Sequence, residues 1–234
     1  LAGPDALSGE TWPHYRVFCA EHVPDRATPY KCAPPIRSAE ERELLWEALF
    51  ADSIDMIVSD HSPAPADVKE TESGDFVRAW GGIGSLQLRL QAIWTAAEPR
   101  GAAWEDLSRW LSTAPAELAG LGDRKGTIGE GWDADFVVFD PDDSVEIRGD
   151  DLLHRHPVTP YDGMRLRGSV VATVLRGLTV YQNGKVAPGF VSMLERHCRA
   201  GVGSRRRPGR LLQRRVLCRG GEPGPGRRAG VEAR

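Results

Sequence analysis

The chain has 234 residues, enough for one or two domains with a sizeable core. Its composition, 41% hydrophobic and 27% charged, is that of an ordinary globular protein and excludes a wholly disordered chain. No apolar run reaches the length of a membrane span and no signal peptide is recognisable, so we expect no membrane partner.

The formal net charge of −3 hides two regions of opposite sign. Residues 196–234 contain twelve arginines, no lysine and two acidic residues, which leaves 18 basic and 31 acidic residues in the first 195. An arginine-rich tail can bind nucleic acid electrostatically. A reading-frame error in a GC-rich gene produces the same excess of Arg, Gly and Pro, and we favour this interpretation. We therefore predict that residues 191–234 are disordered or out of frame, with no nucleic-acid partner.

The four cysteines, Cys19, Cys32, Cys198 and Cys218, include no Cys-x-x-Cys pair. This pattern predicts reduced thiols and a cytoplasmic protein rather than a disulfide framework. Because the first residue is leucine and not methionine, we expect that the natural start lies upstream.

The first elements follow the order of a β/α unit. Residues 10–15, Glu-Thr-Trp-Pro-His-Tyr, predict a short strand with His14 at its end. A proline-rich loop spans residues 24–37. Ser38 then opens a helix, with Glu41 completing a capping box. Its predicted apolar stripe consists of Leu44, Leu45, Ala48 and Leu49.

The next strand ends in a cluster of polar residues. An apolar run from Ile54 to Val58 is followed by Asp60, His61 and Ser62, and Pro63 prevents further pairing. In barrel enzymes, catalytic residues lie at the carboxyl ends of buried strands. The alternative is a core strand and a turn in which Asp60 and Ser62 bond to the local backbone.

The rest of the chain predicts helices and then strands. The glycine pair at residues 81–82 allows close backbone approach, and helices follow to about Thr95, from Trp104 and at Pro115. Strands are predicted within residues 125–140 (two), 170–176 and 178–181, with a hairpin turn at Asn183 and Gly184. We predict an α/β body at residues 1–122 and a small β domain at residues 123–190.

These motifs resemble a known superfamily. Residues 59–63 (Ser-Asp-His-Ser-Pro) and the glycine-rich stretch 125–140 resemble the cyclic amidohydrolase branch of the amidohydrolase superfamily. Residues 10–15, 31–37, 75–88 and 156–161 narrow the resemblance to the allantoinases, over residues 1–188 and the C-terminal half of those enzymes. The resemblance implies the C-terminal part of a TIM-type (β/α)8 barrel with a small appended β-sandwich domain.

The resemblance also implies a reaction, the hydrolysis of allantoin to allantoate, and a binuclear site for Zn²⁺ bridged by a carbamylated lysine. His14 and Asp60 match metal ligands, and Asp60 also matches the catalytic residue that handles the proton. Imidazole nitrogen and carboxylate oxygen both suit zinc. His61, Ser62 and the backbone at Ala33 are expected to contact substrate. The family's homotetramers imply a homo-oligomer.

Three features distinguish this chain from the family pattern. The family's other ligands belong to an N-terminal half that is missing, so two of six protein ligands remain and we expect no activity from the chain alone. His154 and His156 have the spacing of a ligand pair but lie elsewhere in the pattern, and we interpret them as structural. Trp12 stands where relatives carry cysteine; strand alternation would point it beside His14, an overpacking of about 1–3 kcal/mol.

Two alternatives remain open. A sister activity, that of a dihydropyrimidinase or hydantoinase, is separable by substrate. A non-catalytic scaffold related to dihydropyrimidinase would keep the fold and lack metal ligands. The retention of His14 and Asp60 argues against the scaffold.

Overall fold

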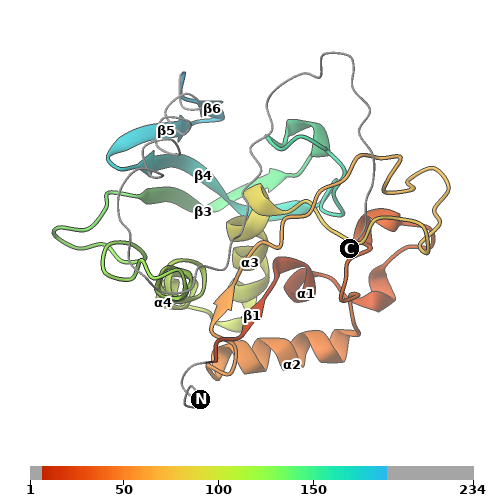
Figure 1. The fold of residues 1–234 in the computed structure, drawn as a ribbon, viewed down its shortest axis with the longest axis horizontal. Helices are drawn as coiled ribbons and strands as arrows, with labels where there is room; N and C mark the ends of the chain where they lie inside the picture. The colour runs from red at the N-terminus through yellow and green to blue at the C-terminus, as the bar shows by residue number, and fades with distance from the viewer. Residues whose placement is uncertain (1–6, 189–234) are drawn as a thin grey trace, which may run out of the picture. The chain divides into compact units, whose positions relative to one another are not determined.

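The computed structural model describes residues 7–188, which form a mixed α/β structure (Figure 1). The predicted α/β class is confirmed at this level. The helices are α1 (Pro13–Val17), α2 (Ala39–Phe50), α3 (Arg89–Ala97), α4 (Trp104–Ser108) and α5 (Ala114–Leu118), with a π-helical turn η6 (Arg109–Thr113) between the last two. Short 3-10 turns are η2 (Ala20–His22), η3 (Thr28–Tyr30), η4 (Leu86–Leu88), η5 (Glu98–Arg100) and η7 (Gly149–Asp151).

Two short parallel strands carry the predicted site. β1 (Glu10–Thr11) pairs with β2 (Met56–Ile57), with Glu10 opposite Met56 and Thr11 opposite Ile57. Helix α2 lies between them in the chain, so the predicted β/α unit is present. Met56 and Ile57 are buried, as a strand covered on both faces requires. Within residues 7–188 these two strands are the whole parallel sheet, and no closed barrel forms.

Helix α2 begins where the sequence indicates. The Ser38 side chain accepts from the backbone N–H of Glu41, and the Glu41 carboxylate accepts from the N–H of Ser38. The predicted apolar stripe is only partly correct, because Leu44 is 55% exposed while Leu49 is fully buried. Trp46 takes the inward position, since its large ring fills the space between α2 and the helices packed against it.

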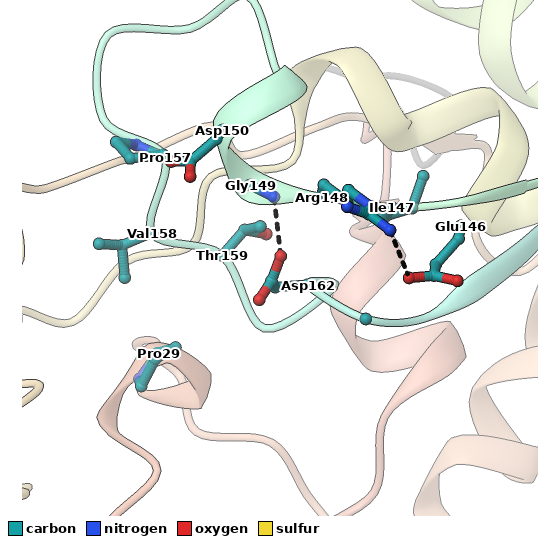
Figure 2. Close-up of a pocket in the computed structure, with 11 residues that line it drawn as sticks. Pro29, Glu146, Ile147, Arg148, Gly149, Asp150, Pro157, Val158, Thr159 and Asp162 are labelled. Carbon is teal, nitrogen blue, oxygen red and sulfur yellow. Dashed lines mark hydrogen bonds and ion pairs between the residues drawn. The ribbon is translucent and has the colours of Figure 1, made fainter.

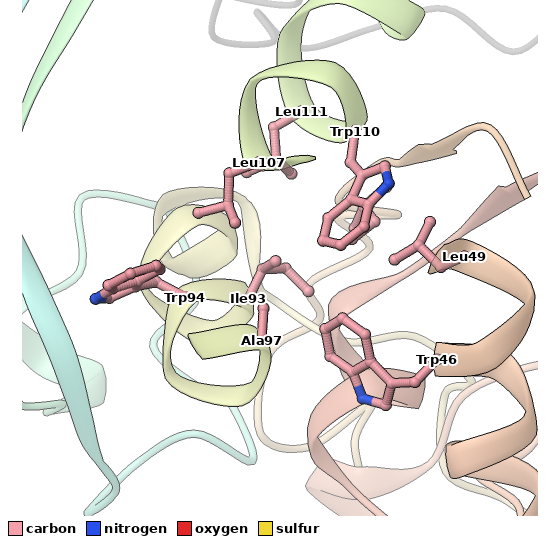
Figure 3. Close-up of a cluster of buried hydrophobic side chains, with 9 residues drawn as sticks. Trp46, Leu49, Ile93, Trp94, Ala97, Leu107, Trp110 and Leu111 are labelled. Atoms are coloured by element: carbon pink, nitrogen blue, oxygen red, sulfur yellow. The ribbon is translucent and has the colours of Figure 1, made fainter. Parts of the chain in front are cut away.

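The main core lies between α2, β2, α3 and the α4–η6 segment (Figure 3). Indole rings and aliphatic side chains from these elements interdigitate, and the Trp46 and Trp110 ring centroids are 6.2 Å apart. The buried members are Trp46, Leu49, Ile57, Ile93, Trp94, Ala97, Leu107, Trp110 and Leu111. Trp110 is fully buried in this core, whereas Trp104 at the start of α4 is 46% exposed. This core anchors β2, and thereby the residues that follow it.

A four-stranded antiparallel sheet follows, in the order β3 (Phe136–Glu146), β4 (Arg165–Leu175), β5 (Leu178–Gln182) and β6 (Lys185–Val186). The hairpin turn at Asn183 and Gly184 is confirmed, and both residues have positive φ. The stretch 125–140 contributes one strand rather than two, because residues 125–135 form turns that ion pairs of Lys125 hold together.

The sheet packs on α3 through a buried contact. The Gln91 side chain, on α3, donates to the carbonyl of Gly168 in β4 at 2.9 Å. In the part of the chain that the structure describes there is one such sheet, so the second layer of the predicted β-sandwich is not seen there. The boundary near residue 122 stays a prediction. The prediction for residues 191–234 lies outside the described residues, and no described helix is long and apolar enough to cross a membrane.

Candidate functional site

His14 and Asp60 meet just beyond the carboxyl ends of β1 and β2. The strands run in parallel register, so the residues that follow them emerge at the same edge. The Nε2 atom of His14 lies 3.9 Å from Oδ2 of Asp60, which is beyond hydrogen-bonding distance but close enough for both atoms to face one ion or water. The structure therefore brings together the two residues that the family resemblance implies as metal ligands.

His14 reaches this position from a helix and not from a strand. β1 ends at Thr11, and Pro13 takes the first position of α1, where its missing N–H costs nothing. The prediction of a strand running to His14 is therefore wrong. The alternation argument for Trp12 fails with it, although the Trp12 ring is still close, with its centroid 5.9 Å from that of His14 and 5.0 Å from that of Tyr15.

The imidazole of His14 is buried and lacks a hydrogen-bond partner. Its side chain is 0% exposed, and neither ring nitrogen is bonded to any group among the described residues. Burial and, to a smaller extent, the nearby Lys69 charge lower the pKa of His14 to about 4. The ring is therefore neutral at physiological pH. A buried neutral imidazole with a free nitrogen is the state that a metal ligand needs.

Asp60 supplies a partly exposed carboxylate in an unusual backbone conformation. Its side chain is 38% exposed, and its φ of +42° lies in the left-handed region that few residues other than glycine adopt. Desolvation raises the pKa of Asp60, and the Glu10 carboxylate adds to this effect. Strained backbone at a carboxylate beside an unpartnered histidine is typical of a functional position.

The residues present fit part of a divalent-metal site. One imidazole and one carboxylate face each other, but no group of three or more His, Cys, Asp or Glu side chains with metal-site geometry occurs within residues 7–188. A catalytic zinc normally has three protein ligands. The pair can therefore provide two of the donors that such a zinc needs.

His61 is held by its backbone surroundings. Its Nδ1 atom accepts from the N–H groups of Ser85 and Leu86, each at 3.1 Å. At neutral pH this arrangement leaves the proton on Nε2, because Nδ1 is the acceptor. The ring of His154 packs edge-on against His61, with centroids 5.1 Å apart. His61 is thus an imidazole with a fixed tautomer next to Asp60, and its contact with substrate stays a prediction.

Ser62 and Ala33 both lie against one glycine-rich segment, residues 80–83. A Cβ added to Gly81 would lie 3.6 Å from that of Ala33, and one added to Gly82 would lie 2.5 Å from the Ser62 carbonyl oxygen. The Ser62 N–H donates to the carbonyl of Ile83 at 2.9 Å. This geometry joins two of the predicted substrate-binding residues through the backbone of one short segment.

Sequence reasoning missed Lys69. It lies in the loop after Pro63, yet it is 2% exposed, and its ammonium donates to the carbonyls of Lys31, Trp80 and Gly82. These acceptors are 38, 11 and 13 residues away along the chain. No local pattern identifies such a residue, because its partners are backbone groups brought near by tertiary folding.

A hollow of about 490 Å³ lies where the end of β3 meets the loop before β4 (Figure 2). Its walls include Pro29, Arg148 and Asp162, and the Asp162 carboxylate accepts from the N–H of Gly149 at 2.8 Å. None of the predicted site residues lines it. Two of its three carboxylates, those of Glu146 and Asp162, are already bonded within the wall, so it offers no convergent set of free polar groups.

Comparison with known proteins decides the family. The model of the family described as "Amidohydrolase family" matches residues 17–180. The chain belongs to the amidohydrolase family. Asp60 lies within the matched range, and His14 lies three residues before it. Other amidohydrolases of known identity give a finer comparison.

The curated relatives include many allantoinases. This chain is 49% identical over 176 residues to the allantoinase of Streptomyces avermitilis, covering 75% of this chain and 39% of the relative. It is 44% identical over 193 residues to that of Arabidopsis thaliana, covering 82% of this chain and 38% of the relative. The amidohydrolase described here is thus an allantoinase homologue that spans about two fifths of the length of these relatives.

The solved structures that this fold matches include cyclic amidohydrolases. The fold matches the L-hydantoinase (dihydropyrimidinase) from Arthrobacter aurescens with a TM-score of 0.72 and 34% sequence identity, over 77% of this chain and 40% of that one. The resemblance to cyclic amidohydrolases deduced from the motifs is confirmed.

Proposed function

We propose that this chain contributes to the hydrolysis of the cyclic amide ring of allantoin, with allantoate as the product. The observation that carries the proposal is the pairing of His14 with Asp60 at the ends of two adjacent parallel strands, in a chain homologous to allantoinases. The chain spans about two fifths of those relatives, so the complete active site is a property of a longer assembly.

In the proposed reaction Asp60 transfers the proton. Its carboxylate accepts a proton from the attacking water as the new C–O bond forms at the ring carbonyl. It then gives that proton to the ring nitrogen as the C–N bond breaks. The water oxygen and its other proton enter the new carboxyl group, which releases that proton to solvent as it ionises to the carboxylate of allantoate. A raised pKa suits this role, because the group must both accept and release the proton near neutral pH.

The amidohydrolase family is typically metal-dependent, and we infer that His14 and Asp60 hold part of a zinc site. A bound divalent ion would lower the pKa of water and polarise the scissile carbonyl. The buried, neutral, unpartnered imidazole of His14 supports this assignment. The bridging lysine and the remaining ligands are expected outside residues 7–188.

Three further assignments belong to the same proposal. His61, Ser62 and the backbone at Ala33 would hold the ring, because they lie on or beside the loop that follows Asp60. The parallel pair β1–β2 would form part of a TIM-type barrel, and the antiparallel sheet part of a β-sandwich. The whole enzyme would be a homo-oligomer in the cytoplasm, consistent with the free thiols of Cys19 and Cys32.

A second candidate is hydantoin or dihydropyrimidine ring hydrolysis, favoured by the structural match to a hydantoinase. The two candidate activities can be separated in a chimera. In this chimera the matched part of this chain replaces the corresponding 176-residue region of the Streptomyces avermitilis allantoinase. We expect this chimera to convert allantoin to allantoate and to leave dihydrouracil and unsubstituted hydantoin nearly unchanged. Faster turnover of either alternative ring would overturn the allantoin assignment. The parent allantoinase, assayed in parallel, checks the conditions.

A further inference from the structure

The buried ammonium of Lys69 is surrounded by carbonyl oxygens. Its Nζ atom lies 2.7 Å from the oxygen of Lys31, 3.0 Å from that of Trp80 and 2.5 Å from that of Gly82. In the part of the chain that the structure describes, no carboxylate lies within ion-pair distance of it. A lysine that is 2% exposed is therefore held by three backbone acceptors alone.

This arrangement needs the protonated form of the side chain. An ammonium has three N–H donors and a neutral amine has two, so only the ammonium can bond to all three carbonyls. Burial lowers the pKa of Lys69 to about 8, which still leaves the cation predominant at neutral pH. Since an unpaired buried charge is costly, these three bonds compensate for the desolvation of the ammonium.

The three carbonyls belong to the two segments that border the predicted pocket. Lys31 begins the segment that contains Ala33, and Trp80 and Gly82 belong to the glycine-rich segment. The Lys31 carbonyl also accepts from the N–H of Gly82 at 3.0 Å. Lys69 thus joins the wall that contains Ala33 to the segment on which Ser62 rests.

Residues 85 and 86, which follow the glycine-rich segment, bond to His61 and to Ser59 just after β2. The N–H groups of Ser85 and Leu86 fix the His61 ring, and the Ser85 hydroxyl donates to the Ser59 carbonyl at 2.7 Å. A shift of residues 80–86 would therefore move His61 and Ser62 together. Lys69 is the side chain that bonds to both this segment and the segment that contains Ala33, and the Lys31 ammonium adds bonds to the carbonyls of Val77 and Ala79 just before residue 80.

We infer that Lys69 is a positioning residue that fixes the distance between the two walls of the substrate pocket, the backbone at Ala33 and the segment that supports His61 and Ser62. The inference rests on the proposed function of these residues as the substrate pocket. Lys69 does not itself contact substrate, because its ammonium is enclosed and all three of its N–H groups are bonded.

The position of the walls can be measured without any assay of activity. Hydrogen exchange of the full 234-residue chain, followed by NMR, compares Lys69→Met with the wild type. The amides of Gly82 and Ser62 report on the contact between the two walls, since they donate to the carbonyls of Lys31 and Ile83. We expect both amides to exchange at least about tenfold faster in Lys69→Met, the effect of losing buried hydrogen-bond partners.

Two further variants keep this test decisive. Lys125→Met removes an ammonium bonded to Asp133 and Asp135, remote from the pocket, and should leave both reporter amides unchanged. Lys69→Arg retains a buried cation if Lys69→Met does not fold, and its planar fork cannot direct three N–H groups to convergent acceptors. Unchanged exchange of Gly82 and Ser62 in every folded Lys69 variant, or no protection of these amides in the wild type, would overturn the inference.

The effect of Lys69→Met on kinetics can be measured in the chimera. Lys69→Met should raise KM for allantoin at least about tenfold while the zinc content stays that of the wild type, because the walls move and the metal ligands do not. A lower melting temperature with an unchanged KM would show a merely structural role and contradict the positioning role. If the chimera does not hydrolyse allantoin, the proposed function fails, and hydrogen exchange still decides whether Lys69 holds the two walls.

Discussion

Gly82 and Ser62 are packed so closely that a side chain at position 82 has no room. A Cβ built on Gly82 would lie 2.5 Å from the carbonyl oxygen of Ser62 and 2.6 Å from its Oγ. Real Cβ atoms do not approach backbone oxygens this closely, so either Ser62 or the glycine segment would have to move. The loop after Asp60 therefore depends on the size of a residue that is twenty positions away from Ser62.

Gly82→Ala should destabilise the chain by about 1–3 kcal/mol, the usual cost of overpacking. Gly81→Ala is the matched control, because its new Cβ would meet nothing closer than 3.6 Å and its φ is not positive. We expect Gly81→Ala to change stability by less than about 1 kcal/mol, in the stabilising direction. Urea unfolding of the two variants measures the difference. Equal stabilities would contradict the close contact between Gly82 and Ser62.

Trp46 and Trp110 differ in one respect that mutation can expose. The Trp46 Nε1 donates to the carbonyl of Arg16 at 3.2 Å, whereas the buried Nε1 of Trp110 has no partner among the described residues. Both rings belong to the main core (Figure 3). Trp46→Phe should therefore cost about 1 kcal/mol more than Trp110→Phe, because it leaves a buried carbonyl unsatisfied. Thermal unfolding of both variants checks the order, and the reverse order would contradict the hydrogen-bond assignment.

An ion pair between α2 and η5 should make stability depend on pH in the acid range. Arg100 donates to both carboxylate oxygens of Glu43, at 2.9 and 2.7 Å, and these bonds lower the pKa of Glu43. A lowered folded-state pKa gives stability that is present above the unfolded value of about 4.3 and is lost as the pH falls through the folded value. The carboxylate is 45% exposed, so the contribution is at most about 1 kcal/mol.

Glu43→Gln should accordingly lower the melting temperature at pH 7 and have little effect at pH 3, where the wild-type carboxyl is also neutral. Glu47→Gln, at an exposed position one turn further along α2, is the control and should change little at either pH. Thermal unfolding at the two pH values gives the comparison. A Glu43→Gln effect that is the same at pH 3 and pH 7 would show that the ion pair does not contribute.

Features that depend on neighbouring residues could be predicted from the sequence. Ser38 and Glu41 satisfy each other within one helical turn, and Asn183 and Gly184 adopt positive φ within one hairpin. Asp60 could be identified because an apolar strand ends just before it. Each of these features is determined by residues that are close together in the sequence.

Features that depend on tertiary contacts could not be predicted in the same way. The strand expected to reach His14 ends earlier because Pro13 starts a helix, and Trp46 replaces Leu44 in the core because the facing helices leave space for an indole. Lys69 gave no signal at all, since its three acceptors are backbone carbonyls from other segments. The pair of His14 and Asp60 was foreseen from family resemblance, while the distance between them needed the structure.

The most direct test of the proposed site measures turnover of allantoin and bound zinc together in the chimera. His14→Ala and Asp60→Asn should each lower kcat/KM by about 10²–10⁴-fold or more and reduce the zinc content, because each removes a ligand and Asp60 also transfers the proton. Asp67→Asn, at an exposed position in the loop after Asp60, should leave both quantities unchanged. Ser62→Ala should mainly raise KM. Full turnover and full zinc content in His14→Ala, or a loss in His154→Ala as large as that in His14→Ala, would contradict the assignment of His14 and Asp60 as the metal-binding pair.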